Sequence, residues 1–179
     1  MIKKFSFEEA LKESKEYFNG DELAASVWVQ KYALKDSCGG IFESNPRMMH
    51  YRIAKELARV ESKYPNPRSE EEIFDAIDKF RYLVPQGSPM SGIGNEKQVT
   101  SISNCFVIGH ESDSYGGIMK DDEELIQLMK RRAGVGLDLS HIRPKGSGVK
   151  NAAITSTGIV PFMERYSNST REVAQDGRK

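Results

Sequence analysis

Residues 99–108 read Val-Thr-Ser-Ile-Ser-Asn-Cys-Phe-Val-Ile, and residues 135–139 read Val-Gly-Leu-Asp-Leu. The first stretch alternates apolar with polar side chains and is rich in β-branched residues, which predicts a strand that contains Cys105. The second stretch predicts another short strand. These two segments decide the fold class, because what connects them determines whether the strands run parallel.

The connection between the two strands is expected to be helical. A polar loop over residues 110–117 is followed by carboxylates at 121–124 and cations at 130–132, which suit the two ends of a helix dipole. We therefore expect a helix over about 121–133 and a final helix over 161–173. The order strand, helix, strand, helix implies an α/β domain with parallel strands.

The residues before this region are predicted to form four helices. Capping-box pairs indicate helices that begin after Ser6 and after Ser69, Asp21 can cap another, and Pro46 suits a first helical turn. The last of the four carries an apolar stripe at Ile73, Ile77, Phe80 and Leu83.

A cluster of five glycines and prolines within residues 85–94 marks the boundary between the two parts. Neither a helix interior nor a strand interior is expected to tolerate that density of Gly and Pro. The sequence therefore predicts an all-helical domain over residues 1–85, followed by an α/β domain over residues 86–179.

The composition excludes several classes of function. The 179 residues carry 26 Lys and Arg against 26 Asp and Glu, so the zero net charge argues against nucleic acid and against a polybasic membrane surface. No apolar run is long enough to span a bilayer. Two distant cysteines and three scattered histidines suggest a reducing, cytoplasmic compartment and no structural metal.

Cys105 and the nearby glycines are the first candidates for chemistry. A cysteine on a strand of an α/β domain can be a redox thiol or a nucleophile, or it can be a small buried apolar side chain. Gly134 and Gly136 would let a ligand or another backbone approach closely. They form neither a dinucleotide-binding fingerprint nor a phosphate-binding P-loop.

The loop over residues 140–150 is the second candidate, because it combines three cations, two serines and two glycines. Such a loop suits a phosphate, or it can be a solvated loop whose cations offset acidic neighbours. Asp113 and Ser114 could accept ribose hydroxyls or simply form a turn. Together these loops would suit a nucleotide.

Five segments are distinctive, namely residues 18–28, 83–92, 103–108, 131–146 and 155–176. Taken in order, they resemble the large catalytic subunit of ribonucleotide reductase. In that family an all-helical region precedes a ten-stranded α/β barrel made of two parallel halves. The resemblance implies that helical domain and the first, incomplete part of such a barrel. The pattern looks most like the bacterial enzymes that use adenosylcobalamin to start the radical. The likeness covers nearly the whole chain.

The resemblance implies four residues for the reaction itself. Cys105 matches the family's first-strand redox cysteine, which forms a disulfide with a later barrel cysteine as the ribose 2′ position is reduced. Ser88, Asn104 and Gly134 match positions that line the substrate nucleotide.

Five further residues are implied for an allosteric effector, a deoxynucleoside triphosphate or ATP. Asp113, Ser114 and Tyr115 match the segment that holds the sugar of that effector. Arg143 and Lys150 match cations near its phosphates.

The resemblance also implies partners. The family's radical cysteine and second redox cysteine match nothing up to residue 179, so we expect the chain to be inactive without the remainder of the barrel. The whole enzyme would take a ribonucleoside diphosphate or triphosphate. It would use adenosylcobalamin bound outside this chain and a thioredoxin-like reductant, and it would form a homodimer through the helix over 121–133. The alternative is a non-catalytic module of the same fold for nucleotide binding and dimerisation.

Overall fold

The computed structural model describes residues 3–109 and 112–173, so His110 of the predicted polar loop and the end of the stretch 155–176 lie outside the described residues. The chain forms two compact units that divide between Ile102 and Ser103. No helix among the described residues is long and apolar enough to cross a membrane.

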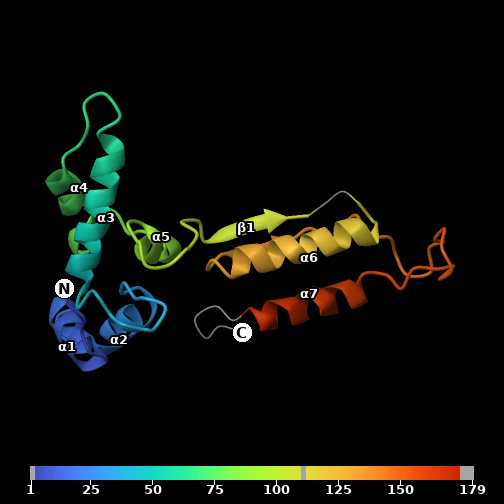
Figure 1. The fold of residues 1–179 in the computed structure, drawn as a ribbon, viewed down its shortest axis with the longest axis horizontal. Coiled ribbons are helices and arrows are strands. Elements are labelled where there is room, and N and C mark those ends of the chain that lie inside the picture. The colour runs from blue at the N-terminus through green and yellow to red at the C-terminus, as the bar shows by residue number, and fades with distance from the viewer. Residues whose placement is uncertain (1–2, 110–111, 174–179) are drawn as a thin grey trace. The chain divides into compact units, whose positions relative to one another are not determined.

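The first unit is helical, as predicted, and its helices begin where the capping residues indicate (Figure 1). Ser6 and Ser69 each accept a hydrogen bond from the backbone N–H three residues on, and the glutamate there accepts one in return. Asp21 accepts from the backbone N–H of Ala24 in the same way. These contacts satisfy N–H groups that a helix end leaves without partners. The helices are α1 (Phe7–Tyr17), α2 (Glu22–Lys31), α3 (Pro46–Glu61) and α4 (Glu70–Ile77).

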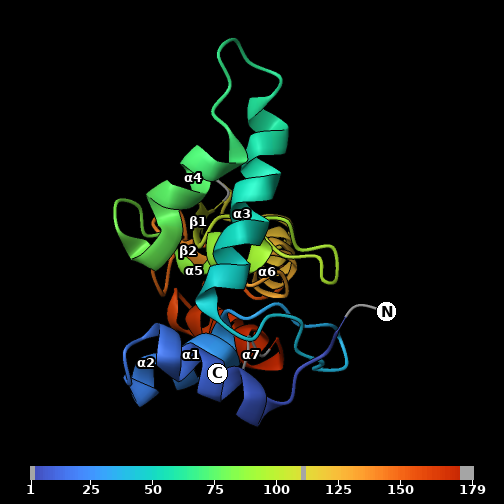
Figure 2. The same ribbon diagram turned by 90° about the vertical axis from the view of Figure 1, so that its left-hand side faces the viewer.

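One apolar cluster holds these helices together, and α3 contributes several of its buried side chains. Helix α4 lies alongside α3 (Figure 2). Met49 and Ile53 of α3 are almost fully buried, and so is Trp28 of α2, whose indole N–H lies 3.4 Å from the Met49 sulfur. Each large apolar side chain buried in this way contributes about 1.5–3 kcal/mol to stability.

The predicted extension of the fourth helix to Leu83 is wrong. Helix α4 ends at Ile77, and a short 3-10 turn, η1 (Asp78–Phe80), follows it. Lys79 and Phe80 both have φ of 55°, in the left-handed region that ends a helix. Contacts distant in sequence stabilise this turn: the Tyr17 hydroxyl accepts from the Lys79 N–H at 2.7 Å, and the Phe80 ring packs edge-on against His50.

The stretch rich in glycine and proline is also different from expectation, because it contains a short helix, α5 (Gly87–Gly92). Pro89 is tolerated because it lies in the first turn, where backbone N–H groups have no helical partner. Ser88 and Met90 are buried.

Arg52 attaches residues beyond 85 to the first unit, which extends to Ile102. Its guanidinium donates to the Glu43 carboxylate at 2.7 Å and to the carbonyl of Met90 at 2.9 Å, and it also contacts the carbonyl of Ile93. These bonds attach α5 and the residues after it to α3. The ion pair is buried, with only 10% of the Arg52 side chain and 4% of the Glu43 side chain exposed.

The second unit has the predicted order of strand, helix, strand and helix, and its two strands are parallel. Cys105 pairs with Gly134, and Ile108 pairs with Leu137. Helix α6 lies between β1 and α7 (Figure 1). The first strand is shorter than expected, because Val99 and Ile102 lie before it and are exposed. The elements are β1 (Cys105–Ile108), α6 (Tyr115–Met129), β2 (Gly134–Leu137) and α7 (Val160–Glu172).

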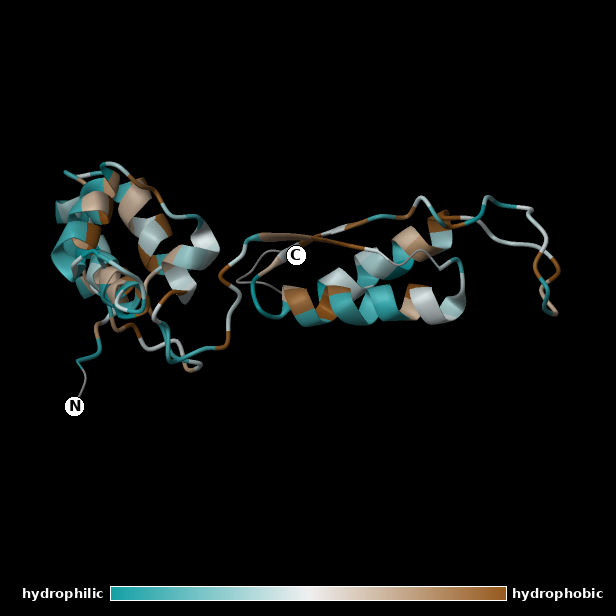
Figure 3. Ribbon diagram, turned by 90° about the horizontal axis from the view of Figure 1, so that it is seen from above, coloured by the Kyte–Doolittle hydropathy of each residue, from teal (hydrophilic) through white to brown (hydrophobic). Residues whose placement is uncertain are grey.

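Helix α6 begins six residues earlier than predicted, because Ser114 caps it. The acidic residues expected at its start are therefore in its middle, which is hydrophilic between more hydrophobic ends (Figure 3). Asp122 is buried there and forms an ion pair with Arg165 of α7 at 2.9 Å. Burial, together with Asp121 and Asp122, raises the pKa of Tyr166 to about 12.

We predict that Glu43→Gln destabilises the first unit strongly. The substitution leaves the Arg52 charge buried without a counter-ion, which costs about 3–5 kcal/mol. Urea unfolding followed by the fluorescence of Trp28, the single tryptophan, measures the loss. Glu56→Gln is the matched control, because Glu56 of α3, the helix that carries Arg52, pairs with Arg59 at the surface. Equal effects of the two substitutions would contradict the role given to Arg52.

We predict that the first unit becomes less stable as pH falls below about 6.5, and that His50 causes part of this loss. Burial lowers the pKa of His50, against a smaller opposing effect of Asp78. The unfolded chain therefore takes up a proton at higher pH than the folded chain does. The contribution of neutral His50 to the unfolding free energy is fully present above the pKa of the unfolded chain, and it falls as the pH drops below that value.

The test compares urea unfolding at pH 7 and pH 5, followed by Trp28 fluorescence. His50→Gln should reduce the difference in unfolding free energy between the two pH values, whatever its effect at pH 7. His141→Gln, at an exposed histidine, should keep that difference. An unchanged pH dependence in His50→Gln would refute the assignment.

Candidate functional site

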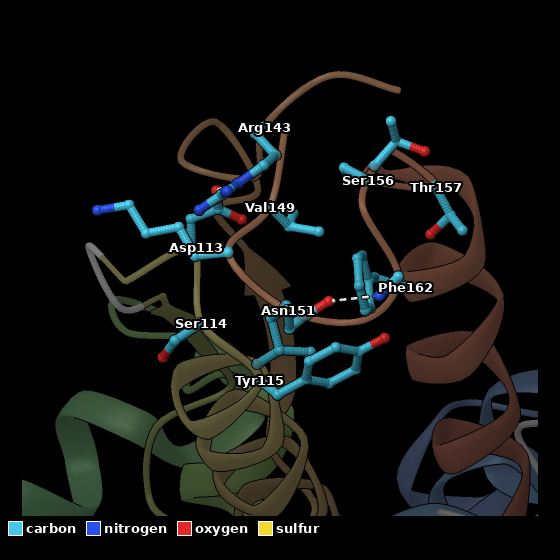
Figure 4. A pocket seen from close by; sticks show the side chains of 13 residues that line it. Asp113, Ser114, Tyr115, Arg143, Val149, Asn151, Ser156, Thr157 and Phe162 are labelled. Atoms are coloured by element: carbon cyan, nitrogen blue, oxygen red, sulfur yellow. Dashed lines mark hydrogen bonds and ion pairs between the residues drawn. The ribbon is translucent and has the colours of Figure 1, made fainter. Parts of the chain in front are cut away.

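A pocket of about 340 Å³ lies in the second unit, where the start of α6 meets the loop after β2 (Figure 4). Both strands end at this side of the unit, because in a parallel pair the carboxyl ends share an edge, where open α/β sheets commonly bind ligands. The structure brings together at this pocket all five residues that the family resemblance implied for an effector: Asp113, Ser114, Tyr115, Arg143 and Lys150.

The start of α6 places the first three of these side chains. Ser114 accepts a hydrogen bond from the Gly117 N–H at 3.2 Å, and its hydroxyl lies 2.7 Å from that of Ser112. Gly117 is required here, because an added Cβ would come within 2.8 Å of the Ser112 carbonyl oxygen. The positive end of a 15-residue helix therefore lies beside the pocket, where it favours an anion.

A hairpin-like loop forms the opposite wall. Gly148 pairs with Thr155 as an antiparallel bridge, and the Gly146 N–H donates to the Ser156 carbonyl at 2.9 Å. Gly158, at φ of 80°, closes the loop, and an added Cβ there would lie 3.0 Å from the Lys145 backbone. These contacts place Lys150 at the pocket.

Arg143 joins the two walls. Its Nε donates to a carboxylate oxygen of Asp113, and one terminal nitrogen donates to the Gly148 carbonyl at 3.1 Å. The Arg143 side chain is 38% exposed and that of Asp113 is 23% exposed. The pair is thus accessible from the pocket.

The remaining lining was not predicted. Tyr115 and Phe162 form an edge-to-face pair with ring centroids 5.9 Å apart, which gives the pocket an apolar wall. Phe162 comes from α7, and only tertiary packing brings it here. The glycines around the hairpin were the available signal for the remaining polar residues of the pocket, Asn151, Thr155, Ser156 and Thr157.

Cys105, Asn104 and Gly134 lie together at the opposite end of the strand pair. The Gly134 N–H donates to the Asn104 carbonyl at 2.6 Å, and a Cβ added to Gly134 would lie 3.8 Å from the Cys105 sulfur. Cys105 is exposed, so the alternative of a buried apolar side chain is wrong. Ser88 belongs to α5 of the first unit and is buried there.

Comparisons with known proteins agree with this division. Residues 18–97 match the family model described as ribonucleotide reductase, all-alpha domain, and residues 103–179 match that of ribonucleotide reductase, barrel domain. The two matches together cover most of the chain.

Three relatives illustrate the similarity. The ribonucleoside-diphosphate reductase subunit alpha of Buchnera aphidicola subsp. Schizaphis graminum is 22% identical over 99% of this chain and 23% of its own length. The subunit alpha of Enterobacteria phage T4 is 27% identical over 83% of this chain and 19% of its own length. Large chain 2 of Saccharomyces cerevisiae is 36% identical over 44% of this chain and 9% of its own length.

The chain thus spans less than a quarter of the length of each of these relatives. Its two compact units correspond to the two family models, and the parallel strand pair belongs to the start of the barrel. The chain is therefore a member of the ribonucleotide reductase large-subunit family, and it corresponds to the all-α domain and the first part of the barrel domain.

Proposed function

We propose that the pocket binds a deoxynucleoside triphosphate or ATP as the allosteric effector of a ribonucleoside-diphosphate reductase. The observation that carries this proposal is convergence. The five residues come from two separate segments of the chain, and all of them line one pocket. One segment is 113–115 at the start of α6, and the other is the loop after β2, which carries Arg143 and Lys150. The family resemblance independently implies one effector for all five.

The chemistry of the pocket suits the parts of such a ligand. Arg143 and Lys150 give cations for phosphates, and the N-terminus of α6 adds its dipole. Asp113 and Ser114 offer oxygens to the sugar hydroxyl. Tyr115 and Phe162 offer an apolar surface of the kind that packs against a sugar or a base.

We further propose that Cys105 is one of the two thiols that reduce the substrate, a ribonucleoside diphosphate. In this step the cysteine pair loses two electrons and two protons and becomes a disulfide. The bond from C2′ of the ribose to its hydroxyl breaks, the hydroxyl leaves as water, and a C2′–H bond forms in its place. Asn104, Gly134 and Ser88 would contact the substrate. A thioredoxin-like reductant would restore both thiols by disulfide exchange.

The complete subunit would act in the cytoplasm as a homodimer that pairs through α6. We assign adenosylcobalamin as its radical source, because the sequence pattern resembles the bacterial enzymes that use it. That cofactor supplies the initial radical when bound, and no described residue of this chain is assigned to hold it.

Titration of the chain with deoxynucleoside triphosphates tests the effector site. We predict saturable binding that Arg143→Ala weakens at least about tenfold, because the substitution removes a charge-assisted contact to phosphate. Lys150→Ala should weaken it as well. Lys145→Ala is the matched control, since this lysine belongs to the same loop but does not line the pocket. Equal losses in all three variants would indicate a general charge effect and contradict the proposal.

A second prediction concerns access to the Cys105 thiol. In a Cys38→Ser background, Gly134→Val should slow the reaction of Cys105 with an aromatic disulfide several-fold, because the new side chain lies beside the sulfur. The release of the coloured thiol measures the rate. Gly136→Val adds the same bulk beside Val107 instead and should have less effect. Equal rates in the two variants would contradict the arrangement of Cys105 and Gly134.

A further inference from the structure

The two side chains at the centre of the proposed effector site contact each other. The Asp113 carboxylate accepts from Nε of Arg143, and a second nitrogen of the same guanidinium donates to the Gly148 carbonyl. Asp113 is the group proposed to take a sugar hydroxyl, and Arg143 is one of those proposed to take phosphate. Each therefore already has a partner within this chain.

A phosphate at Arg143 would disturb this ion pair. It would compete with the Asp113 carboxylate for the guanidinium, and it would also place like charges close together, which is unfavourable at short range. The Asp113 carboxylate would then lose part of the hydrogen bonding and opposite charge that the guanidinium supplies. Because the pair is only partly exposed, water would replace the lost contact incompletely.

A sugar hydroxyl changes this balance. It can donate a hydrogen bond to the carboxylate that the guanidinium has left. One nucleotide therefore supplies a new partner to each side chain, a phosphate to Arg143 and a hydroxyl to Asp113. An inorganic polyphosphate offers the anion without that hydroxyl. A nucleotide therefore leaves the Asp113 carboxylate with a hydrogen-bond donor from the ligand, and an inorganic polyphosphate does not.

We propose that Asp113 is a specificity-determining residue. Through its ion pair with Arg143, it disfavours ligands that bring phosphates without a sugar hydroxyl. This inference rests on the proposed effector site and adds a reason why the site prefers nucleotides over free polyphosphate. The Gly148 carbonyl supports the pair by holding the guanidinium in the loop.

The test is the ratio of two dissociation constants, that of inorganic tripolyphosphate divided by that of thymidine 5′-triphosphate, measured by calorimetry on the 179-residue chain. In Asp113→Asn the amide keeps an acceptor for the hydroxyl but loses the charge. We expect tripolyphosphate to bind more tightly and the ratio to fall about threefold to tenfold. The melting temperature of each variant verifies that it is folded.

Asp138→Asn is the matched control. Asp138 is an exposed carboxylate of the same unit that accepts from Ser140 and does not line the pocket. It removes the same charge and should leave the ratio unchanged. If Asp113→Asn shifts both ligands by the same factor, or weakens tripolyphosphate, the inference is overturned while the effector site stands. Failure of the nucleotide to bind the wild-type chain would overturn the proposed function and the inference with it.

Discussion

The parallel pairing of β1 with β2 determines where the functional residues of the second unit lie. Cys105 and Gly134 are paired at the amino ends of the strands, and the loops of the pocket follow the carboxyl ends of both strands. An antiparallel pair would place one of those loops at the opposite edge. The thiol and the pocket therefore lie at opposite ends of one short sheet, and α6 connects the two strands between them.

Each unit contains a buried or partly buried ion pair that connects two of its own segments. In the first unit, Arg52 lies between Glu43 and the carbonyls of Met90 and Ile93, and it attaches α5 to α3. In the second unit, Asp122 of α6 meets Arg165 of α7. Such pairs have a desolvation penalty that offsets much of their attraction, so they contribute more to a defined arrangement than to net stability.

The parts of the fold that depend on local chemistry were predictable. The capping boxes at Ser6 and Ser69 are short-range patterns, and both helices begin where these patterns indicate. The order of strands and helices also indicated the parallel sheet. The error at α4 has a long-range cause, because Tyr17 and His50 stabilise the turn after that helix. The error at α6 has a local cause: Ser114 caps the helix six residues earlier than the charge pattern indicated, so the acidic run is in mid-helix.

The same distinction applies to the site. The family resemblance pointed to Asp113 and Arg143 on separate loops, and the structure places them in contact. Phe162 and the polar residues after Asn151 could not be found in this way. Their place depends on how α7 packs and on the bridge between Gly148 and Thr155, which local sequence does not specify.

The walls of the pocket are also part of the scaffold of the second unit. Ile118 belongs to its small apolar cluster, Phe162 packs against that cluster, and both line the pocket. A ligand that fills the pocket would bind only the folded unit, so its binding free energy would add to the folding free energy of that unit. Slower hydrogen exchange at the backbone amides of α6 and α7 would therefore report occupancy of the pocket, even at amides that touch no ligand atom.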